Sequence, residues 1–238
     1  QTKVSFAYDT DFLLYFDNRE YDPASGQTSQ TIFGARLAPE IGVQIADSTE
    51  SVHRLMAGVS YNQPFGADWG EVTVKPTVYY RLLFNKFDIN LGLIPYRFLK
   101  ERLPEYLLSD TISYYNSNLQ GALLQYETEL GYATLMADWR GMYSYETREA
   151  FRVIATGQYK YKWLQVGGYA MLNHLANSTQ TEGVYDDIMI NPYVNFSIEQ
   201  FLPPIDLFNI RIGYIGGFQR ERATETSYFT QNIKNRNI

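Results

Sequence analysis

The chain has 238 residues, a formal net charge of −6 and no cysteine. The negative charge argues against nucleic acid as a main partner, and the missing cysteine excludes disulfides, thiolate metal sites, a cysteine nucleophile and a lipoprotein anchor. No run of about 18 apolar residues exists, so the sequence offers no transmembrane helix. Aromatic residues make up 16% of the chain, which suits strands and membrane interfaces.

Hydrophobicity alternates with a period of two along most of the chain, which predicts β-strands rather than long amphipathic helices. Eleven strands are expected, near residues 4–16, 33–45, 55–61, 72–84, 87–93, 122–127, 133–140, 151–159, 164–172, 187–199 and 208–219. Side chains alternate faces along a strand, so each strand has one apolar and one polar face. No linker interrupts the pattern, and we expect a single domain over residues 1–238.

The stretch 72–93 predicts a hairpin. Its apolar residues carry even numbers up to Phe84 and odd numbers from Phe87 onward. A two-residue turn at Asn85 and Lys86 places Phe84 opposite Phe87, so the change of parity preserves one continuous apolar face. Three prolines, Pro39, Pro76 and Pro192, fall within predicted strands. Each lacks the backbone N–H that would pair with a neighbouring strand, which predicts local breaks there.

The connections between the predicted strands alternate in length. Those after even-numbered strands are short or moderate, and those after odd-numbered strands are mostly longer, as at 97–118 and 173–186. Outer-membrane barrels combine short periplasmic turns with long extracellular loops, so the pattern places the N-terminus on the periplasmic side. The start at Gln1, without a hydrophobic leader, favours a mature exported protein.

Strand length and the placement of charge favour a membrane barrel over a soluble all-β domain, which is the alternative. Many strands alternate over the roughly 9–11 residues that a tilted strand needs to cross a bilayer. We therefore expect an all-β, transmembrane, antiparallel up-and-down β-barrel. Eleven strands is an odd number, and residues 223–238 alternate weakly. The chain is therefore expected to show at least 11–12 strands of a larger barrel, about 14–18 in all, and to be C-terminally incomplete.

Several phrases between residues 90 and 222 resemble porin-like outer-membrane proteins of Bacteroidota. They are "RFLKERLPEYLLSDTISYYNSNLQGALLQY" (97–126), "DWRGM" (138–142), "REAF" (148–151), "HLANS" (174–178) and "NPY" (191–193). The resemblance implies an outer-membrane barrel in a Gram-negative bacterium more firmly than it implies a substrate.

Ten charged residues on the predicted polar faces are expected to line the lumen. They are Arg36, Glu40, Arg54, Lys75, Arg81, Asp88, Asp138, Arg140, Arg152 and Arg211. A cationic lining would favour anionic solutes, because fixed charge in a narrow pore sets selectivity. Acids and bases are interleaved, however, which favours a lumen held together by Arg–carboxylate pairs.

The long connection 97–118 mixes charged and apolar residues and has two interpretations. Either it folds into the barrel and constricts it, or it forms an extracellular cap or a partner-binding loop. The constriction candidates are Arg97, Lys100, Glu101, Arg102, Glu105 and Asp110.

The sequence gives little support for catalysis. We expect no enzyme activity, and the least favoured alternative is an outer-membrane lipid hydrolase whose esterase activity would be lost on replacing His174 or His53. His53 and His174 are the only histidines and each has serines nearby, but no nucleophile elbow or HExxH motif is present. His174 is expected at the start of an outer loop, as a polar loop residue. Asp186 and Asp187 are expected in an exposed acidic turn rather than in a Ca²⁺ site. No cofactor or metal site is predicted.

These observations predict a porin-like channel for passive diffusion of small hydrophilic solutes across the bacterial outer membrane. Its partners would be outer-membrane lipid, lipopolysaccharide and the solutes, with further copies of the chain or other outer-membrane proteins beside it. The alternative is a structural barrel subunit of a multi-protein outer-membrane complex, with its lumen blocked.

Overall fold

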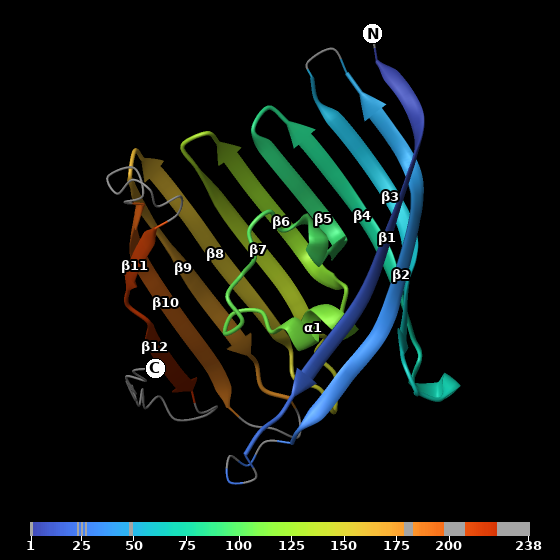
Figure 1. Ribbon diagram of the computed structural model, residues 1–238. Helices are drawn as coiled ribbons and strands as arrows, with labels where there is room; N and C mark the ends of the chain where they lie inside the picture. The colour runs from blue at the N-terminus through green and yellow to red at the C-terminus, as the bar shows by residue number, and fades with distance from the viewer. Residues whose placement is uncertain are drawn as a thin grey trace. The chain divides into compact units, whose positions relative to one another are not determined.

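The computed structural model describes residues 2–22, 24, 26, 28–47, 50–178, 183–197 and 208–222, without the side chains at 110, 111 and 113. The described strands form one antiparallel sheet, in which consecutive strands are neighbours from β1 to β11 (Figure 1). The all-β, up-and-down architecture predicted from the sequence is therefore confirmed. No helix within the described ranges is long and apolar enough to cross a membrane.

The strands have the lengths that a membrane sheet needs. Their bounds are β1 Lys3–Arg19, β2 Gln30–Ala46, β3 Val52–Pro64, β4 Thr73–Phe84, β5 Phe87–Pro95, β6 Asn118–Thr128, β7 Gly131–Gly141, β8 Ala150–Tyr161, β9 Leu164–Leu175, β10 Val184–Ser197, β11 Asn209–Gly213 and β12 Gly216–Arg222. Short 3-10 helices lie at Trp69–Glu71 and Tyr96–Phe98, and the helix α1 spans Asp110–Tyr115. Most strands thus reach or exceed the roughly 9–11 residues of a membrane-crossing strand.

Strands β11 and β12 are two halves of one edge strand, because both pair with β10 in the same register. Tyr193 lies opposite Gly213, and Ile190, three residues earlier, lies opposite Gly216, three residues later. The interruption falls opposite Pro192, which has no N–H to donate. The twelve strands therefore occupy eleven positions in the sheet, and the break predicted at Pro192 is confirmed.

A second proline interrupts pairing on one side only. Between β2 and β3 the paired residues pass from Leu37 and Tyr61 to Glu40 and Gly58, so Pro39 is skipped. On the other side of β2, Pro39 lies in an unbroken register opposite Thr10. The local break predicted at Pro39 is therefore confirmed on the side of β3.

The predicted hairpin at residues 72–93 is present. Strand β4 ends at Phe84 and β5 begins at Phe87, so Asn85 and Lys86 form the turn. Asn85 has a φ of 52°, a left-handed conformation that asparagine adopts more readily than most residues. The change of parity at this pair is thus the consequence of a tight turn between two strands.

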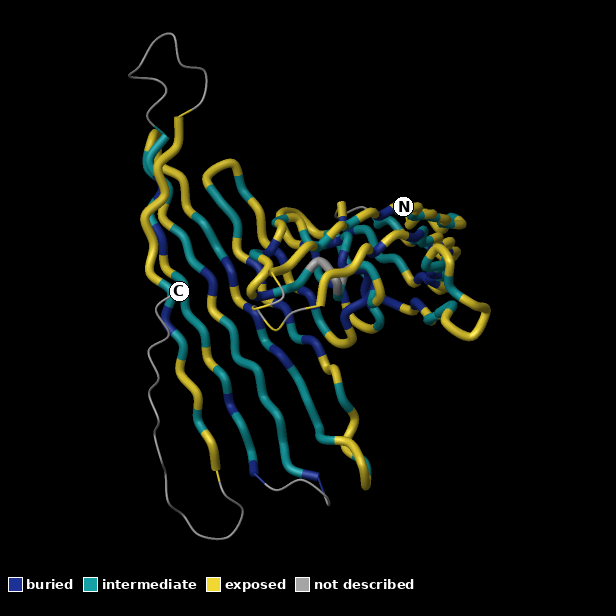
Figure 2. The backbone as a smooth tube through the Cα atoms, turned by 60° about the horizontal axis from the view of Figure 1, so that its bottom comes forward, coloured by how far each residue is buried: buried dark blue, intermediate teal, exposed yellow. Residues whose placement is uncertain are grey.

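The two faces of the sheet have the polarity of a membrane barrel. We call the face with exposed apolar side chains the outer face; Phe6 and Phe12 keep 69% and 67% of their surface exposed there. The inner face carries buried polar side chains, among them Glu40, Asp88 and Asp138. Figure 2 shows the resulting alternation of burial along the strands. A soluble barrel requires the reverse arrangement, so the predicted outward exposure of the apolar face is confirmed, while its contact with lipid stays a prediction.

Contacts along the chain divide it into two compact units, which are described separately. Unit 1 contains Gln1–Leu82 and Leu91–Leu119, and unit 2 contains Leu83–Asn90 and Gln120–Ile238. The predicted single domain and the predicted larger barrel of 14–18 strands stay predictions. Residues 223–238, considered above as a weak twelfth strand, lie outside the described residues.

In unit 1 the segment that follows β5 packs against the inner face. Leu103 and Leu107 of this segment are buried. The ring of Tyr114 in α1 stacks on Tyr15 of β1, with ring centroids 4.9 Å apart. Farther on, the Asn118 side-chain amide donates to the Thr77 hydroxyl at 2.8 Å. The segment therefore fills space on the inner side of unit 1.

Candidate active site on the outer face

A histidine and an aspartate form a hydrogen-bonded pair on the outer face of unit 2. His174 is the second-to-last residue of β9, and the register places it opposite Asp186 of β10. The imidazole Nδ1 lies 2.6 Å from Asp186 Oδ1. Both side chains are largely shielded, with 19% and 11% of their surface exposed. Because Leu172 and Ala170 share this face of β9, the polar pair lies at the edge of an apolar surface.

One aromatic ring packs on the other side of the imidazole, and a second ring packs behind the first. Phe151 of β8 lies opposite His174, and its ring stacks on the imidazole at a centroid distance of 4.7 Å. Trp139 of β7 lies opposite Phe151 and stacks on it at 4.8 Å. The four residues Trp139, Phe151, His174 and Asp186 thus form one row across four strands. Stacking and the hydrogen bond together restrict rotation of the imidazole.

Two arginines surround the pair and the chain that connects β9 to β10. Arg222 of β12 contacts Asp186 Oδ2 at 2.8 Å, so both carboxylate oxygens are engaged. Arg148 donates through Nε to the carbonyl oxygen of Ala176 at 2.7 Å and through Nη2 to that of Gly183. Its guanidinium lies over the ring of Tyr185, 4.9 Å from the centroid. The contacts of Arg148 join the two described ends of the β9–β10 connection, which lie next to the pair in sequence.

The pair has the geometry of a general base and its orienting acid. A carboxylate that accepts a hydrogen bond from Nδ1–H leaves Nε2 as the nitrogen able to take a proton. The nearest serine in the sequence is Ser178, which follows β9 and is buried. The residues present therefore support proton abstraction from a hydroxyl, either that of a serine or that of water.

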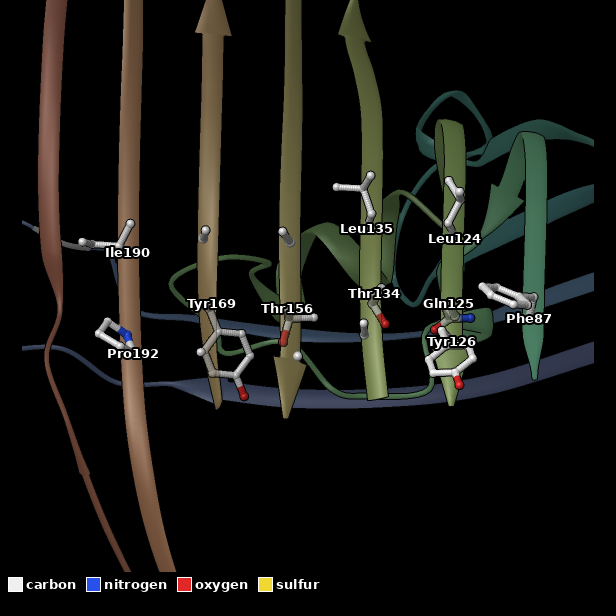
Figure 3. A pocket seen from close by; sticks show the side chains of 15 residues that line it. Phe87, Leu124, Gln125, Tyr126, Thr134, Leu135, Thr156, Tyr169, Ile190 and Pro192 are labelled. Carbon is white, nitrogen blue, oxygen red and sulfur yellow. The ribbon is translucent and has the colours of Figure 1, made fainter. Parts of the chain in front are cut away.

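Small side chains hollow the outer face farther along the same strands. Ala170 lies opposite Ala155 of β8, and one row below them Gly168 lies opposite Gly157. Larger side chains, including those of Leu124, Leu135, Ile190 and Pro192, border this strip (Figure 3). The groove has a volume of about 700 Å³.

The groove extends along the strands beyond these rows. A second hollow of about 410 Å³ shares Tyr126, Ala133 and Gly157 with it and continues toward the turn between β8 and β9. On the opposite side, Leu172 and Val153 lie paired between the groove and His174. The apolar groove and the His–Asp pair therefore share strands β9 and β10, where one row of aliphatic residues separates them.

In unit 1, the charged residues predicted to line a lumen lie against named partners. Arg36 pairs with Asp11 at 3.1 Å, and Arg54 donates to the side-chain oxygen of Gln44 at 2.7 Å. Lys75 donates to the carbonyl oxygen of Tyr115 at 3.0 Å, and the Arg81 guanidinium lies 4.3 Å from the centre of the Phe98 ring. Glu40 accepts from Arg97 at 2.7 Å and from the Tyr79 hydroxyl at 2.8 Å.

In unit 2, one predicted pair is present, and the other residues contact neutral groups. Arg152 pairs with Asp138 at 3.0 Å, and both side chains are buried. Arg140 donates to Asn173, Asp88 accepts from Asn90 at 2.8 Å, and Arg211 lies over the ring of Tyr193. These contacts do not show whether an open pore exists, so the lining role of the ten residues stays a prediction.

The constriction candidates are spread over the inner side of unit 1. Arg97 bridges Glu40 and Asp9, the latter at 3.2 Å, while Glu105 is exposed. Lys100, Glu101 and Arg102 line a hollow of about 390 Å³ together with Arg36 and Arg97. Asp110 begins α1, and its side chain is not described. Their role as a constriction stays a prediction.

Two expectations from the sequence are wrong for the residues of the His–Asp pair. His174 does not begin a loop, because it lies within β9. Asp186 and Asp187 do not form an exposed acidic turn, because both lie in β10 and Asp186 is buried. Asp187 instead accepts from Asn173 at 3.3 Å. Within the described residues, no group of three or more His, Asp or Glu side chains is placed to hold a metal ion.

The fold and site define a β-sheet protein of the membrane-barrel type with a His–Asp pair on its apolar outer face. A family model described as lipid A 3'-O-deacylase-type matches residues 1–195. The chain belongs to this family. Because the family is named for an enzyme activity, the expectation that the protein is not an enzyme is wrong.

The chain was also compared with curated proteins and with solved structures. No curated protein matches the chain. Among solved structures, a triple mutant of the Rhodopseudomonas blastica porin is similar, with a TM-score of 0.35 and 10% identity over 94% of this chain and 91% of that chain.

Proposed function

We propose that this protein hydrolyses an O-linked acyl ester of a membrane lipid at the His174–Asp186 pair, and that its substrate is a lipid A-type glycolipid of the outer membrane. The observation that carries the proposal is the 2.6 Å hydrogen bond between these side chains on a face that is otherwise apolar. Polar groups facing lipid are costly, so their presence there calls for a function. The family name indicates the reaction and the substrate class.

The pair supplies the proton transfers of ester hydrolysis. Nε2 of His174 takes the proton of the attacking hydroxyl as its oxygen bonds to the ester carbonyl carbon. The same proton passes to the departing sugar oxygen when the carbon–oxygen bond of the ester breaks. Asp186 stabilises the transient imidazolium, and Arg222 keeps that carboxylate in place. If a serine attacks first, a water molecule then releases the acyl chain by the same steps.

The groove gives the acyl chain a place to lie. His174 and Ala170 are four residues apart on β9, which is about 13 Å along a strand. An acyl chain whose ester group lies at His174 can therefore pass Leu172 and Val153 and enter the groove. Lipid tails are as apolar as the groove, so selection there rests on packing rather than on the hydrophobic effect.

The test is fatty-acid release from purified lipopolysaccharide by the protein in detergent micelles, measured by mass spectrometry. We expect His174→Ala to lower the rate by at least ~100-fold, the usual contribution of a positioned general base. Asp186→Asn should lower it as well, whereas Asp187→Asn, the neighbouring carboxylate on the inner face, should leave it unchanged. Full activity in a folded His174→Ala protein would overturn the proposal.

A further inference from the structure

A second histidine, in unit 1, joins a serine and a tyrosine in a chain of hydrogen bonds. The Ser51 hydroxyl lies 3.2 Å from Nε2 of His53. On the other side of the ring, Nδ1 lies 2.7 Å from the hydroxyl of Tyr80 in β4. Ser51 immediately precedes β3, and His53 is the second residue of that strand. The three side chains are thus arranged in the order hydroxyl, imidazole, phenol, with the imidazole in the middle.

The backbone of Ser51 is held by the turn that precedes β3. The Asp47 N–H donates to the Ser51 carbonyl oxygen at 3.1 Å, and the Ser51 N–H donates to Asp47 Oδ1 at 3.2 Å. These two bonds close the connection between β2 and β3. With its backbone held in this way, Ser51 directs its hydroxyl to the imidazole at 3.2 Å.

His53 and Tyr80 lie on the apolar outer face, and Ser51, just before β3, is buried beside them. His53 is opposite Ile45 of β2, and Leu55 follows two residues later on the same side of β3. Ile45 and Leu55 are 39% and 62% exposed. Ionisable side chains are rare on such an apolar face, so a histidine there calls for a functional explanation. His53 is the second residue of β3, so the polar group lies at one end of that strand, as a site for ester groups at a membrane interface would.

We propose that Ser51 is the nucleophile of a second acyl-ester site, with His53 as its base, Tyr80 as a positioning residue and a glycerophospholipid ester as substrate. With its proton on Nδ1, the ring donates to the Tyr80 oxygen, and Nε2 accepts from the Ser51 hydroxyl. This arrangement matches the general pattern of an activated serine. The site shares no residue with the His174–Asp186 pair and is independent of it.

The reaction has two balanced steps. Ser51 Oγ bonds to the ester carbonyl carbon while its proton moves to Nε2, and the ester bond breaks as the glycerol oxygen leaves with that proton. The acyl-serine is then attacked by water, whose proton passes to Nε2 and on to Ser51 Oγ as the fatty acid is released. No oxidant, metal or cofactor is required.

The experiment is covalent labelling of the folded protein with an alkyl fluorophosphonate, which reacts with activated serines by losing fluoride. We expect an adduct on the peptide that contains Ser51, identified by mass spectrometry. Ser51→Ala should abolish this adduct, and His53→Ala should slow its formation by at least ~100-fold. Ser144→Ala, in a connection of unit 2, is the matched control and should change nothing.

Further variants separate catalysis from structure and from the proposed lipid A deacylation. Tyr80→Phe should slow labelling and shift the pH at which its rate is half-maximal, an effect that a purely structural tyrosine would not have. His174→Ala should leave labelling of Ser51 intact even where it abolishes release from lipopolysaccharide. Absence of a Ser51 adduct in the folded wild-type protein, or equal labelling in folded His53→Ala, would overturn this proposal alone.

Discussion

Arg97 donates to the side chain of Glu40 at 2.7 Å, and no surface of the Glu40 side chain is exposed. Arg97 belongs to the short helix after β5, while Glu40 lies near the middle of β2. The same guanidinium contacts Asp9 of β1 at 3.2 Å, and the Tyr79 hydroxyl occupies the other oxygen of Glu40. One arginine therefore fastens the segment after β5 to two strands of unit 1.

Removing this arginine should destabilise unit 1. Arg97→Met leaves the Glu40 carboxylate buried without its cation, and breaking a buried pair in this way costs about 3–5 kcal/mol. We expect a lower urea midpoint for unfolding in detergent, measured by tryptophan fluorescence. Arg102→Met, an exposed position in the same segment, is the control. Equal midpoints for the two variants would show that the Arg97 pair contributes nothing.

Filling the groove should change which acyl chains are released. Ala155→Leu and Ala170→Leu place bulk in the strip of small residues on β8 and β9. We expect hydrolysis of a p-nitrophenyl myristate ester to fall about tenfold, equivalent to ~1.4 kcal/mol, with a butyrate ester unaffected. Ala57→Leu, an exposed outer-face alanine of unit 1, should change neither rate. A parallel loss for both esters would assign the effect to something other than chain binding.

The aromatic row should matter for catalysis more than for binding. Phe151→Ala removes the ring that stacks on His174, so the imidazole gains freedom to leave the orientation set by Asp186. We expect kcat to fall roughly tenfold with KM nearly unchanged, about 1.4 kcal/mol of lost transition-state stabilisation. Tyr161→Ala, an exposed aromatic at the end of the same strand that lines neither hollow, should leave both kcat and KM unchanged. A change in KM alone would contradict a positioning role.

Conductance measurements test the channel that the sequence predicts. A passive pore produces stable ohmic steps when the protein is inserted into a planar bilayer, and the inner-face arginines would make it favour anions. Silence in the bilayer, together with co-purifying protein partners, would instead favour the structural subunit with a blocked lumen. Conductance that persists in His174→Ala would show that transport and ester hydrolysis are separate properties.

The sequence predicted features that depend on a few neighbouring residues. The parity change at Asn85 and Lys86 identified the hairpin, and the alternation around Phe6 and Phe12 identified the apolar outer face. Pro39 and Pro192 marked breaks, because a missing N–H affects pairing wherever the strand lies. The same local pattern misled for His174 and Asp186. The residues between them are mostly polar, which is typical of a loop. The sequence pattern therefore placed His174 and Asp186 in that loop instead of at the ends of β9 and β10.

The order of the strands and the polarity of their two faces were determined by the sequence alone, because a period of two is a local property that every strand repeats. Which side chains meet was decided only by the tertiary structure. Asp186 reaches His174 from 12 residues away and Arg222 from 36, and these meetings follow from strand register. Register depends on the geometry of each connection and on packing between neighbouring strands, neither of which the alternation of apolar and polar residues contains.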